Sequence, residues 1–362
     1  MILLKYVLIF AILVVVELAY FKIADKYNII DKPNERSSHS TIVLRGGGIL
    51  FTLAVILWAL YQIAFGEHAD ATGFEVVVDN LPFVVGLIAV ATVSFVDDVA
   101  GTSNKTRLVM QCMGAVLMLV GLAWPAPMFD VASVFGSHPL GLIVVGVVST
   151  IAAMGIMNVY NFMDGINGIT GGYSLVALAT LFVVNEFVLP DRFMIPSLLV
   201  FEIIALLIFC FFNFRQKGKA KCFAGDVGSV AIAFVILYAM ARLMVATGDV
   251  TWIVLLVVYG IDGCLTICHR IMLHENLGEA HRKHAYQLMA NELKIGAVTI
   301  SSLYMALQLL INMVMIFVIP NTAAAHWTYL VGVIVVLSLA YVLFMKKYYH
   351  LHAEYLESLK TR

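Results

Sequence analysis

The sequence predicts an all-α, polytopic integral membrane protein with about eleven transmembrane helices. Of its 362 residues, 62% are hydrophobic and only 12% are charged, whereas soluble domains carry roughly 25% charged residues. Apolar runs recur along the whole chain at about the 20 residues that a helix needs to cross a bilayer. This composition argues against a soluble protein, and no polar stretch is long enough for an extramembrane domain of ordinary size.

The predicted spans alternate with short polar loops. The first run has no small-residue cleavage site, so we expect a retained span and not a removed signal peptide. The third run is short for a span, and without it about ten spans remain. In chain order, the expected spans lie near 3–24, 46–66, 81–96, 107–124, 140–157, 168–188, 196–214, 226–246, 251–272, 296–319 and 325–345.

Basic residues set the expected orientation, because lysine and arginine stay preferentially on the cytoplasmic side of a membrane. Of the 22 lysines and arginines, all except Lys5, Arg192 and Arg242 fall on one side when the predicted spans alternate. We therefore expect the N-terminus outside and the C-terminus in the cytoplasm. Residues 1–345 would form a single transmembrane domain, and residues 346–362 a cytoplasmic tail resembling a short amphipathic helix at the membrane surface.

Five unusual polar segments fall on the predicted cytoplasmic side, and the outer loops contain nothing comparable. They are DKPNERSSHSTIVLRGGG (31–48), DDVAGTSNKTR (97–107), NVYNFMDGINGITGG (158–172), KCFAGDVGS (221–229) and HENLGEAHRKHAYQ (274–287). We therefore expect one functional site at the inner face, built from loops that are distant in sequence.

Two adjacent carboxylates, Asp97 and Asp98, end the third apolar run. Ionised groups are costly at such a position unless they are solvated, paired or metal-bound. A hydrated helix end would explain them. A Mg²⁺ site would explain them as well, because this hard cation prefers carboxylate oxygens, water and substrate phosphates. Either aspartate would also suit the role of a general base.

Asn158, Asn161 and Asp164 recur every three residues, so they share one face while the helix lasts. Asn167 and Gly168 form a turn signal, and the surrounding glycines permit non-helical backbone. Such backbone is tolerated at membrane depth where it lines a wet cavity or lies buried in protein. A glycine-eased helix packing site is the alternative, but it does not account for the polar face.

The AGDVGS segment resembles a glycine-rich phosphate cradle without the lysine of a P-loop. Gly225 and Gly228 would let a ligand approach the backbone beside Asp226, although the start of an ordinary helix is the alternative. Arg45 precedes three glycines and offers a second anion contact, unless it serves only to set the topology.

His281 and His284 lie three apart, with Arg282 between them. On a helix the two imidazoles would share a face, which suits Zn²⁺, a phosphate group or an ordinary charged surface. We favour phosphate, because the carboxylates elsewhere make an oxygen-ligated Mg²⁺ site more fitting than zinc and because cationic groups neutralise phosphate charge.

Asp262 lies inside the ninth predicted span, and a carboxylate in that position is a functional-site hypothesis by default. Arg270, about two turns farther on, or Arg242 on another span is the expected partner. A structural ion pair and a catalytic role both fit.

Acidic side chains repel a phosphorylated ligand and cationic ones attract it, so a site with both fits a diphosphate bridged by Mg²⁺. Its place at the edge of a bilayer suggests one lipid partner and one aqueous partner, and phosphoryl transfer to a lipid fits that arrangement. The competing class is an ion-coupled secondary transporter with intramembrane carboxylates. Such transporters place their polar residues near the bilayer midplane, whereas here nearly all lie at one face.

DDVAG, NVYNFMDGINGITGG, AGDVGS and AHRKHAYQ resemble, in the same order, motifs of the polyprenyl-phosphate N-acetylhexosamine-1-phosphate transferases within glycosyltransferase family 4. The resemblance extends over nearly the whole chain. It implies transfer of an N-acetylamino-sugar 1-phosphate from a UDP-sugar to undecaprenyl phosphate, with release of UMP. It also implies Mg²⁺, with Mn²⁺ as a substitute, in the inner membrane of a bacterium with the active site facing the cytoplasm. The partners would be the two substrates and membrane lipid, without nucleic acid, and a homodimer is compatible.

The resemblance also assigns roles to individual residues. The catalytic group would be Asp97, Asp98 and Asp164, the first two as the acidic pair that deprotonates the lipid phosphate or acts as nucleophile. Asp226, helped by Asp98, would hold the metal. The substrate-binding group would comprise Arg45, Asn158, Asn161, His281, Arg282 and His284.

Two departures from the family pattern narrow the expected function. Asn167 stands where many members have aspartate, so it can hydrogen-bond but cannot supply charge or act as a base. The histidine motif reads HRKH and not a run of adjacent histidines, which resembles the branch that begins O-antigen or capsule-type envelope glycans. The sugar would be GlcNAc or a deoxy sugar such as FucNAc or QuiNAc.

Overall fold

The computed structural model describes residues 2–31, 42–66, 71–123, 139–277 and 281–360. Parts of the predicted loop 31–48, of the predicted loop 274–287 and of the tail 346–362 lie outside these ranges. The described chain is helical almost throughout, with one two-stranded sheet, so the predicted all-α membrane class is confirmed.

The helices follow the order of the apolar runs. They are α1 (Ile2–Lys26), α2 (Ile49–Phe65), α3 (Gly73–Asp79), α4 (Leu81–Ala100), α5 (Asn104–Ala123), α7 (Pro139–Met163), α8 (Ile169–Val183), the π-helix η1 (Val184–Val188), α9 (Pro196–Asn213), α10 (Gly225–Thr247), the 3₁₀-helix η2 (Val250–Leu256), α11 (Val257–Met272), α12 (Ala285–Asn291), α13 (Ala297–Phe317) and α14 (Ala323–Lys360). The strands are β1 (Ile30–Asp31) and β2 (Val43–Leu44).

Within the described ranges, 10 helices are long and apolar enough to cross a membrane. The run expected to be short, 81–96, is a full span, because α4 continues through Asp97 and Asp98 to Ala100 and reaches 20 residues. The short member is instead α2, with 17 residues. The helix α14 runs without interruption across the boundary predicted at 345/346.

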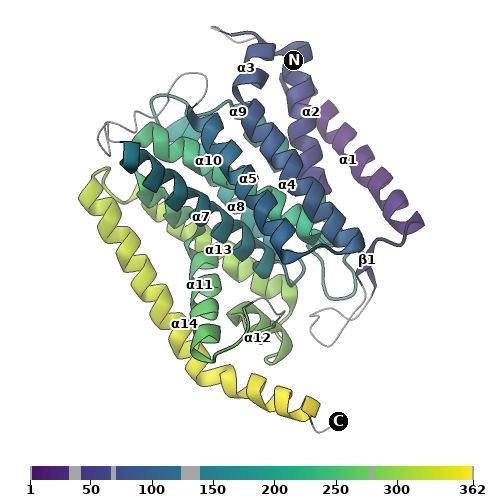
Figure 1. Cartoon of the computed structure of the whole chain (residues 1–362), viewed down its shortest axis with the longest axis vertical. Helices are drawn as coiled ribbons and strands as arrows, with labels where there is room; N and C mark the ends of the chain where they lie inside the picture. The colour runs from purple at the N-terminus through teal and green to yellow at the C-terminus, as the bar shows by residue number, and fades with distance from the viewer. Residues whose placement is uncertain (1, 32–41, 67–70, 124–138, 278–280, 361–362) are drawn as a thin grey trace.

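The core of the bundle lies around α10, which is the most buried of the spans, whereas α14 is the least buried. Figure 1 shows α1 and α14 on opposite flanks of the bundle, with α10 between them. A helix that is apolar on all sides belongs in such a central place, because every face finds a neighbour. The first residues of α10 are therefore held firmly by the surrounding helices.

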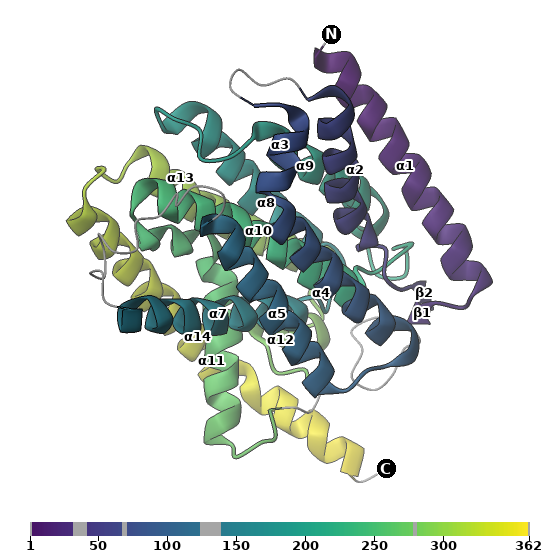
Figure 2. The same cartoon turned by 45° about the horizontal axis from the view of Figure 1, so that its top comes forward.

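Loops that are far apart in sequence meet at one end of the bundle, which we call the site end. It contains β1, β2, the α4–α5 turn, residues 164–168, residues 214–224 and α12. The N-terminus lies at the opposite end, as the views in Figure 1 and Figure 2 agree. The strands pair antiparallel, with Ile30 opposite Leu44, and Leu44 also bridges to Cys222.

The glycines after Arg45 dock against the start of α10 through their backbone. The amide of Gly47 donates to the carbonyl of Phe223 at 2.9 Å, and the amide of Gly48 donates to the carbonyl of Ala224 at 3.1 Å. A Cβ atom on Gly48 would lie 2.3 Å from the Cα atom of Gly228, so only glycine allows this approach. The contact fixes Arg45 next to Asp226.

Replacing Gly48 by alanine is therefore expected to destabilise the protein by about 1–3 kcal/mol, the usual cost of overpacking. The measurement is the midpoint of thermal unfolding in detergent. Gly155→Ala in α7 is the matched control, because its methyl group would meet nothing within 4 Å and alanine favours a helix interior. Equal midpoints for the two variants would contradict the packing argument.

Candidate active site

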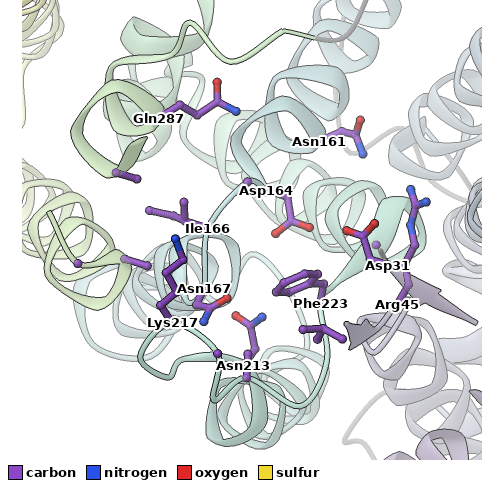
Figure 3. A pocket seen from close by; sticks show the side chains of 18 of the residues that line it. Asp31, Arg45, Asn161, Asp164, Ile166, Asn167, Asn213, Lys217, Phe223 and Gln287 are labelled. Atoms are coloured by element: carbon purple, nitrogen blue, oxygen red, sulfur yellow. The ribbon is translucent and has the colours of Figure 1, made fainter. Parts of the chain in front are cut away.

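A cavity of about 420 Å³ opens at the site end. Its wall combines the end of α7 and the following turn, residues 213–226, α12, and the start of α13. Figure 3 shows Asp164, Asp31 and Arg45 on one side and Lys217 reaching in from the other. The volume lies within the range of small-molecule sites, and the charged lining suits a polar ligand.

Asp98, at the end of α4, binds Arg45 and the backbone of Asp226, which line the acidic side of this cavity. Its side chain is fully buried, and its carboxylate accepts the backbone amides of Asp226 and Val227, both at 3.0 Å. Arg45 Nε lies 2.7 Å from the same carboxylate. A carboxylate at the first amides of a helix is favourable, because those groups have no partner within the helix and carry a partial positive charge.

Arg107, in the first turn of α5, joins the other two carboxylates. Its guanidinium lies 3.1 Å from Asp97 and 2.9 Å from Asp226, and it also donates to Asn161 at 3.4 Å. Asp97 additionally accepts the amide and the hydroxyl of Thr102. Two arginines thus hold Asp97, Asp98 and Asp226 in one cluster, as Arg45 also lies 3.5 Å from Asp226.

The three polar residues predicted to share one face of α7 lie against different parts of the protein: α5, α10 and the cavity wall. Asn158 donates to Gln111 of α5 at 2.8 Å, and Asn161 donates to Ser229 of α10 at 3.0 Å. Asp164 lies just beyond the last residue of the helix, in the cavity wall. Asn161 and Asp164 therefore reach the cavity, whereas Asn158 joins two helices and does not line it.

Burial raises the pKa of Asp164 to about 7, and the negative charges of Asp226 and Asp98 act in the same direction. The folded protein therefore binds a proton at Asp164 more tightly than the unfolded chain does. The stability that this proton contributes is largest at low pH and falls as pH rises from about 4 to about 7, because the unfolded carboxyl ionises first.

Asp164→Asn is expected to remove this part of the pH dependence. The measurement is the unfolding midpoint of wild type and variant without divalent cations. From pH 4.5 to pH 7.5, about the interval between the pKa values of Asp164 in the unfolded and the folded chain, the midpoint of the wild type should fall relative to that of the variant. Groups common to both proteins cancel in this difference. A difference that is constant across the interval would show that Asp164 titrates normally.

Asn167 holds the turn in place and also lines the cavity. Its amide nitrogen donates to the backbone carbonyl of Arg215 at 2.8 Å, and its own carbonyl accepts the Ser301 hydroxyl at 2.8 Å. The residue is buried. An uncharged amide suits this position, because the acceptor of its N–H is a neutral backbone group.

His281, Arg282 and His284, the histidine segment, lie beside the cavity and not in its lining. His284 is buried, with its Nδ1 atom 3.3 Å from Asp262, and the rings of His281 and Phe162 meet edge to face. Burial, together with the neighbouring charges of His284 and Arg270, lowers the pKa of His281 to about 3. His281 is therefore neutral at physiological pH and would offer a hydrogen bond without positive charge.

The structure corrects two expectations in this region. Arg282 turns away from the cavity, because Glu292 binds its guanidinium at 3.0 Å and Tyr355 of α14 stacks on it. Asp262 pairs with neither of the arginines expected for it. It accepts the backbone amides of Ala285 and Tyr286 at the start of α12, at 2.9 and 3.3 Å, together with the histidine.

Sequence reasoning missed several residues at the site. Arg107 was counted only as a topology signal, although it binds two of the three clustered carboxylates. Lys217, Lys294 and Gln287 line the cavity, and none was singled out. The only sequence signal for Lys217 is the basic stretch around 215–221, and the orientation of the spans already explains that stretch.

The carboxylates at this site can hold Mg²⁺ only together with water and a substrate phosphate. Among the residues that the structure describes, no group of three or more His, Cys, Asp or Glu side chains could form a metal cage. Mg²⁺ usually takes one or two carboxylates and completes its shell with water and substrate phosphates. Asp97 and Asp226, brought together by Arg107, meet that need. Asp98 meets it less well, because α10 amides and Arg45 occupy its buried oxygens.

Comparison with known proteins agrees with this arrangement. Residues 80–244 match the family model described as Glycosyl transferase family 4, and this stretch contains the three clustered aspartates. The chain is also similar to a protein of Bacillus subtilis (strain 168) named "Probable undecaprenyl-phosphate N-acetylglucosaminyl 1-phosphate transferase". The two are 24% identical over 282 residues, which is 74% of this chain and 72% of the relative.

Proposed function

We propose that this chain is a member of glycosyl transferase family 4 and that it transfers an N-acetylamino-sugar 1-phosphate from a UDP-sugar to undecaprenyl phosphate. The products are a sugar linked to the lipid through a diphosphate, and UMP. One observation carries the proposal: Asp97 and Asp98 at the end of α4 meet Asp226 at the start of α10, where two arginines bind all three carboxylates and Asp226 lines the polar cavity.

The charges of the cluster suit a diphosphate donor. Arg45 lines the cavity, and its guanidinium has the fork geometry that binds phosphate oxygens bidentately. Arg107 holds Asp97 and Asp226 beside the cavity. Asp226 lies at the start of α10 with its side chain 15% exposed, so it can be reached from the cavity. A bound Mg²⁺, held by Asp97 and Asp226, would supply positive charge to the departing UMP.

The reaction breaks the bond between the sugar-bearing phosphorus and the oxygen that leaves with UMP. In the direct route an oxygen of the lipid phosphate forms the new bond to that phosphorus. In the covalent route the carboxylate of Asp97 attacks first, and the lipid phosphate then displaces it. Exchange of labelled UMP into the UDP-sugar without lipid acceptor separates the two routes, because only the covalent route allows it.

The relative's name favours GlcNAc as the sugar of the donor. The segment HRKH supports a role at the start of an O-antigen or capsule-type glycan, in the bacterial inner membrane. The basic residues at the site end support a cytoplasmic active site, since this is the side on which lysine and arginine stay. The homodimer stays a prediction.

The decisive assay uses purified protein with Mg²⁺, UDP-GlcNAc and a polyprenyl phosphate. We expect release of UMP together with a lipid-linked product that retains the label of the sugar. Failure to release UMP from any UDP-amino sugar, by protein that unfolds cooperatively in detergent, would overturn the proposal.

The arrangement gives no comparable support to a secondary transporter. That alternative depended on intramembrane carboxylates, and Asp262 was its main candidate. The carboxylate of Asp262 caps α12: it accepts two backbone amides at the start of that helix, and it also accepts the Tyr304 hydroxyl. A transporter would show counterflow of a substrate in proteoliposomes without UMP release, which the assay above distinguishes.

A further inference from the structure

The short helix α12 is one wall of the cavity. Gln287 and Ala290 line the cavity, and Tyr286 donates its hydroxyl to the carbonyl of Phe162 at the end of α7. The helix has 7 residues, and isolated helices shorter than about 12 residues are marginal in water. Tertiary contacts must therefore hold this wall in place.

Much of that support comes from the last turns of α14. Ala285 and Leu288, on the face of α12 that turns away from the cavity, pack against Tyr341 and Met345 in one small apolar cluster. Figure 1 and Figure 2 show the end of α14 passing beside α12. The contact places a membrane-spanning helix directly behind the cavity wall.

A buried polar cluster fixes the C-terminal end of α12 to the same helix. Glu292 follows the helix, and its side chain is 5% exposed; it binds Arg282 at 3.0 Å and the Nδ1 atom of His352 at 2.9 Å. His352 is 1% exposed. The ring of Tyr355 covers the Arg282 guanidinium, with 3.8 Å between the guanidinium carbon and the ring centroid.

We propose that the segment of α14 from Tyr341 to Tyr355 is a brace that sets the position of α12, and that His352 and Tyr355 are positioning residues for the donor pocket. The pocket's role in binding the UDP-sugar rests on the proposed function. The brace explains why Arg282 faces α14: it links the start of the histidine segment to the tail through Glu292.

The brace acts on binding more than on the chemical step. Gln287 and Ala290 lie on α12, whereas Asp97, Asp98 and Asp226 belong to α4 and α10, which the tail does not support. Loss of the brace should therefore loosen one wall of the pocket and leave the carboxylate cluster unchanged. This predicts a rise in KM for the UDP-sugar at nearly constant kcat.

His352→Ala tests the brace kinetically, with His350→Ala as the matched control, because His350 is exposed on the same helix two residues away. We expect KM for UDP-GlcNAc to rise about tenfold in His352→Ala, with kcat within about twofold of wild type, the size expected for losing a hydrogen bond to a charged group. His352→Asn should restore most of the affinity, because its amide can donate from near the position of Nδ1. An unchanged KM in His352→Ala, or an equal rise in His350→Ala, would overturn the proposal.

Hydrogen exchange tests the same brace without catalysis. Backbone amides of residues 285–291 should exchange about tenfold faster in His352→Ala than in His350→Ala, while those of α10 keep the wild-type rate, because only α12 loses support. Exchange in α12 at the control rate would overturn the proposal. If the wild type releases no UMP, the proposed function fails, and this exchange experiment still decides on the brace.

Discussion

Asp226→Asn is expected to lower kcat/KM for UMP release by about 1,000-fold, at the upper end of what removing one preorganised electrostatic group costs. The variant keeps the shape of the side chain and removes its charge. It should also fold, because Asp98 accepts the backbone amide at position 226, which asparagine still supplies. The loss would then reflect the chemistry of the site and not the structure of α10.

The measurement is initial-rate kinetics with UDP-GlcNAc and polyprenyl phosphate, alongside the unfolding midpoint in detergent. Asp191→Asn is the matched control, because this aspartate is exposed in the loop between η1 and α9, away from the site end. Activity in Asp226→Asn above about a tenth of wild type would remove Asp226 from the proposed centre, since a carboxylate that holds the metal contributes far more.

The fold could be predicted from sequence because the bilayer imposes one simple rule on it. A span needs about 20 apolar residues, and this signal is local, so nearly every span lies close to its predicted place, whereas the short helices α3 and α12 are not predicted. The error at 81–96 shows where the rule fails. Apolar counting stopped at Asp97, although the helix continues for another turn because that turn finds partners in Arg107 and in the amides of α10.

The site could be predicted as a set of loops but not as a set of contacts. Polar and glycine-rich segments stand out from apolar runs, so the convergence of Asp97, Asp98 and Asp226 was expected and is present. The side chains that bind these carboxylates could not be predicted, because Arg107 and Arg282 look alike in sequence. One bridges two carboxylates at the cavity, and the other is bound by Glu292 and Tyr355 behind it. Only the packing of helices distinguishes them.

Asp262 shows the same limit, since its partners come from a segment more than twenty positions away. The sequence predicts a cationic partner for Asp262, because an isolated charge in a membrane span is costly. The structure satisfies the carboxylate mainly with hydrogen-bond donors: the amides of Ala285 and Tyr286, and the Tyr304 hydroxyl at 2.7 Å. Backbone donors leave no trace in a sequence, so this arrangement could not be read from residue types.

Asp262→Ala is expected to destabilise the protein by about 3–5 kcal/mol, the range for removing one partner from a buried charged cluster. The side chain is 3% exposed, so its removal strands buried donors at the start of α12, and water cannot easily replace it. Thermal unfolding in detergent measures the effect. Thr266→Val is the milder control, because Thr266 contributes a single bond to Asp262, at 3.3 Å. A variant that unfolds within about 1 kcal/mol of wild type would mean that α12 stands without its cap, which a helix of 7 residues should not do.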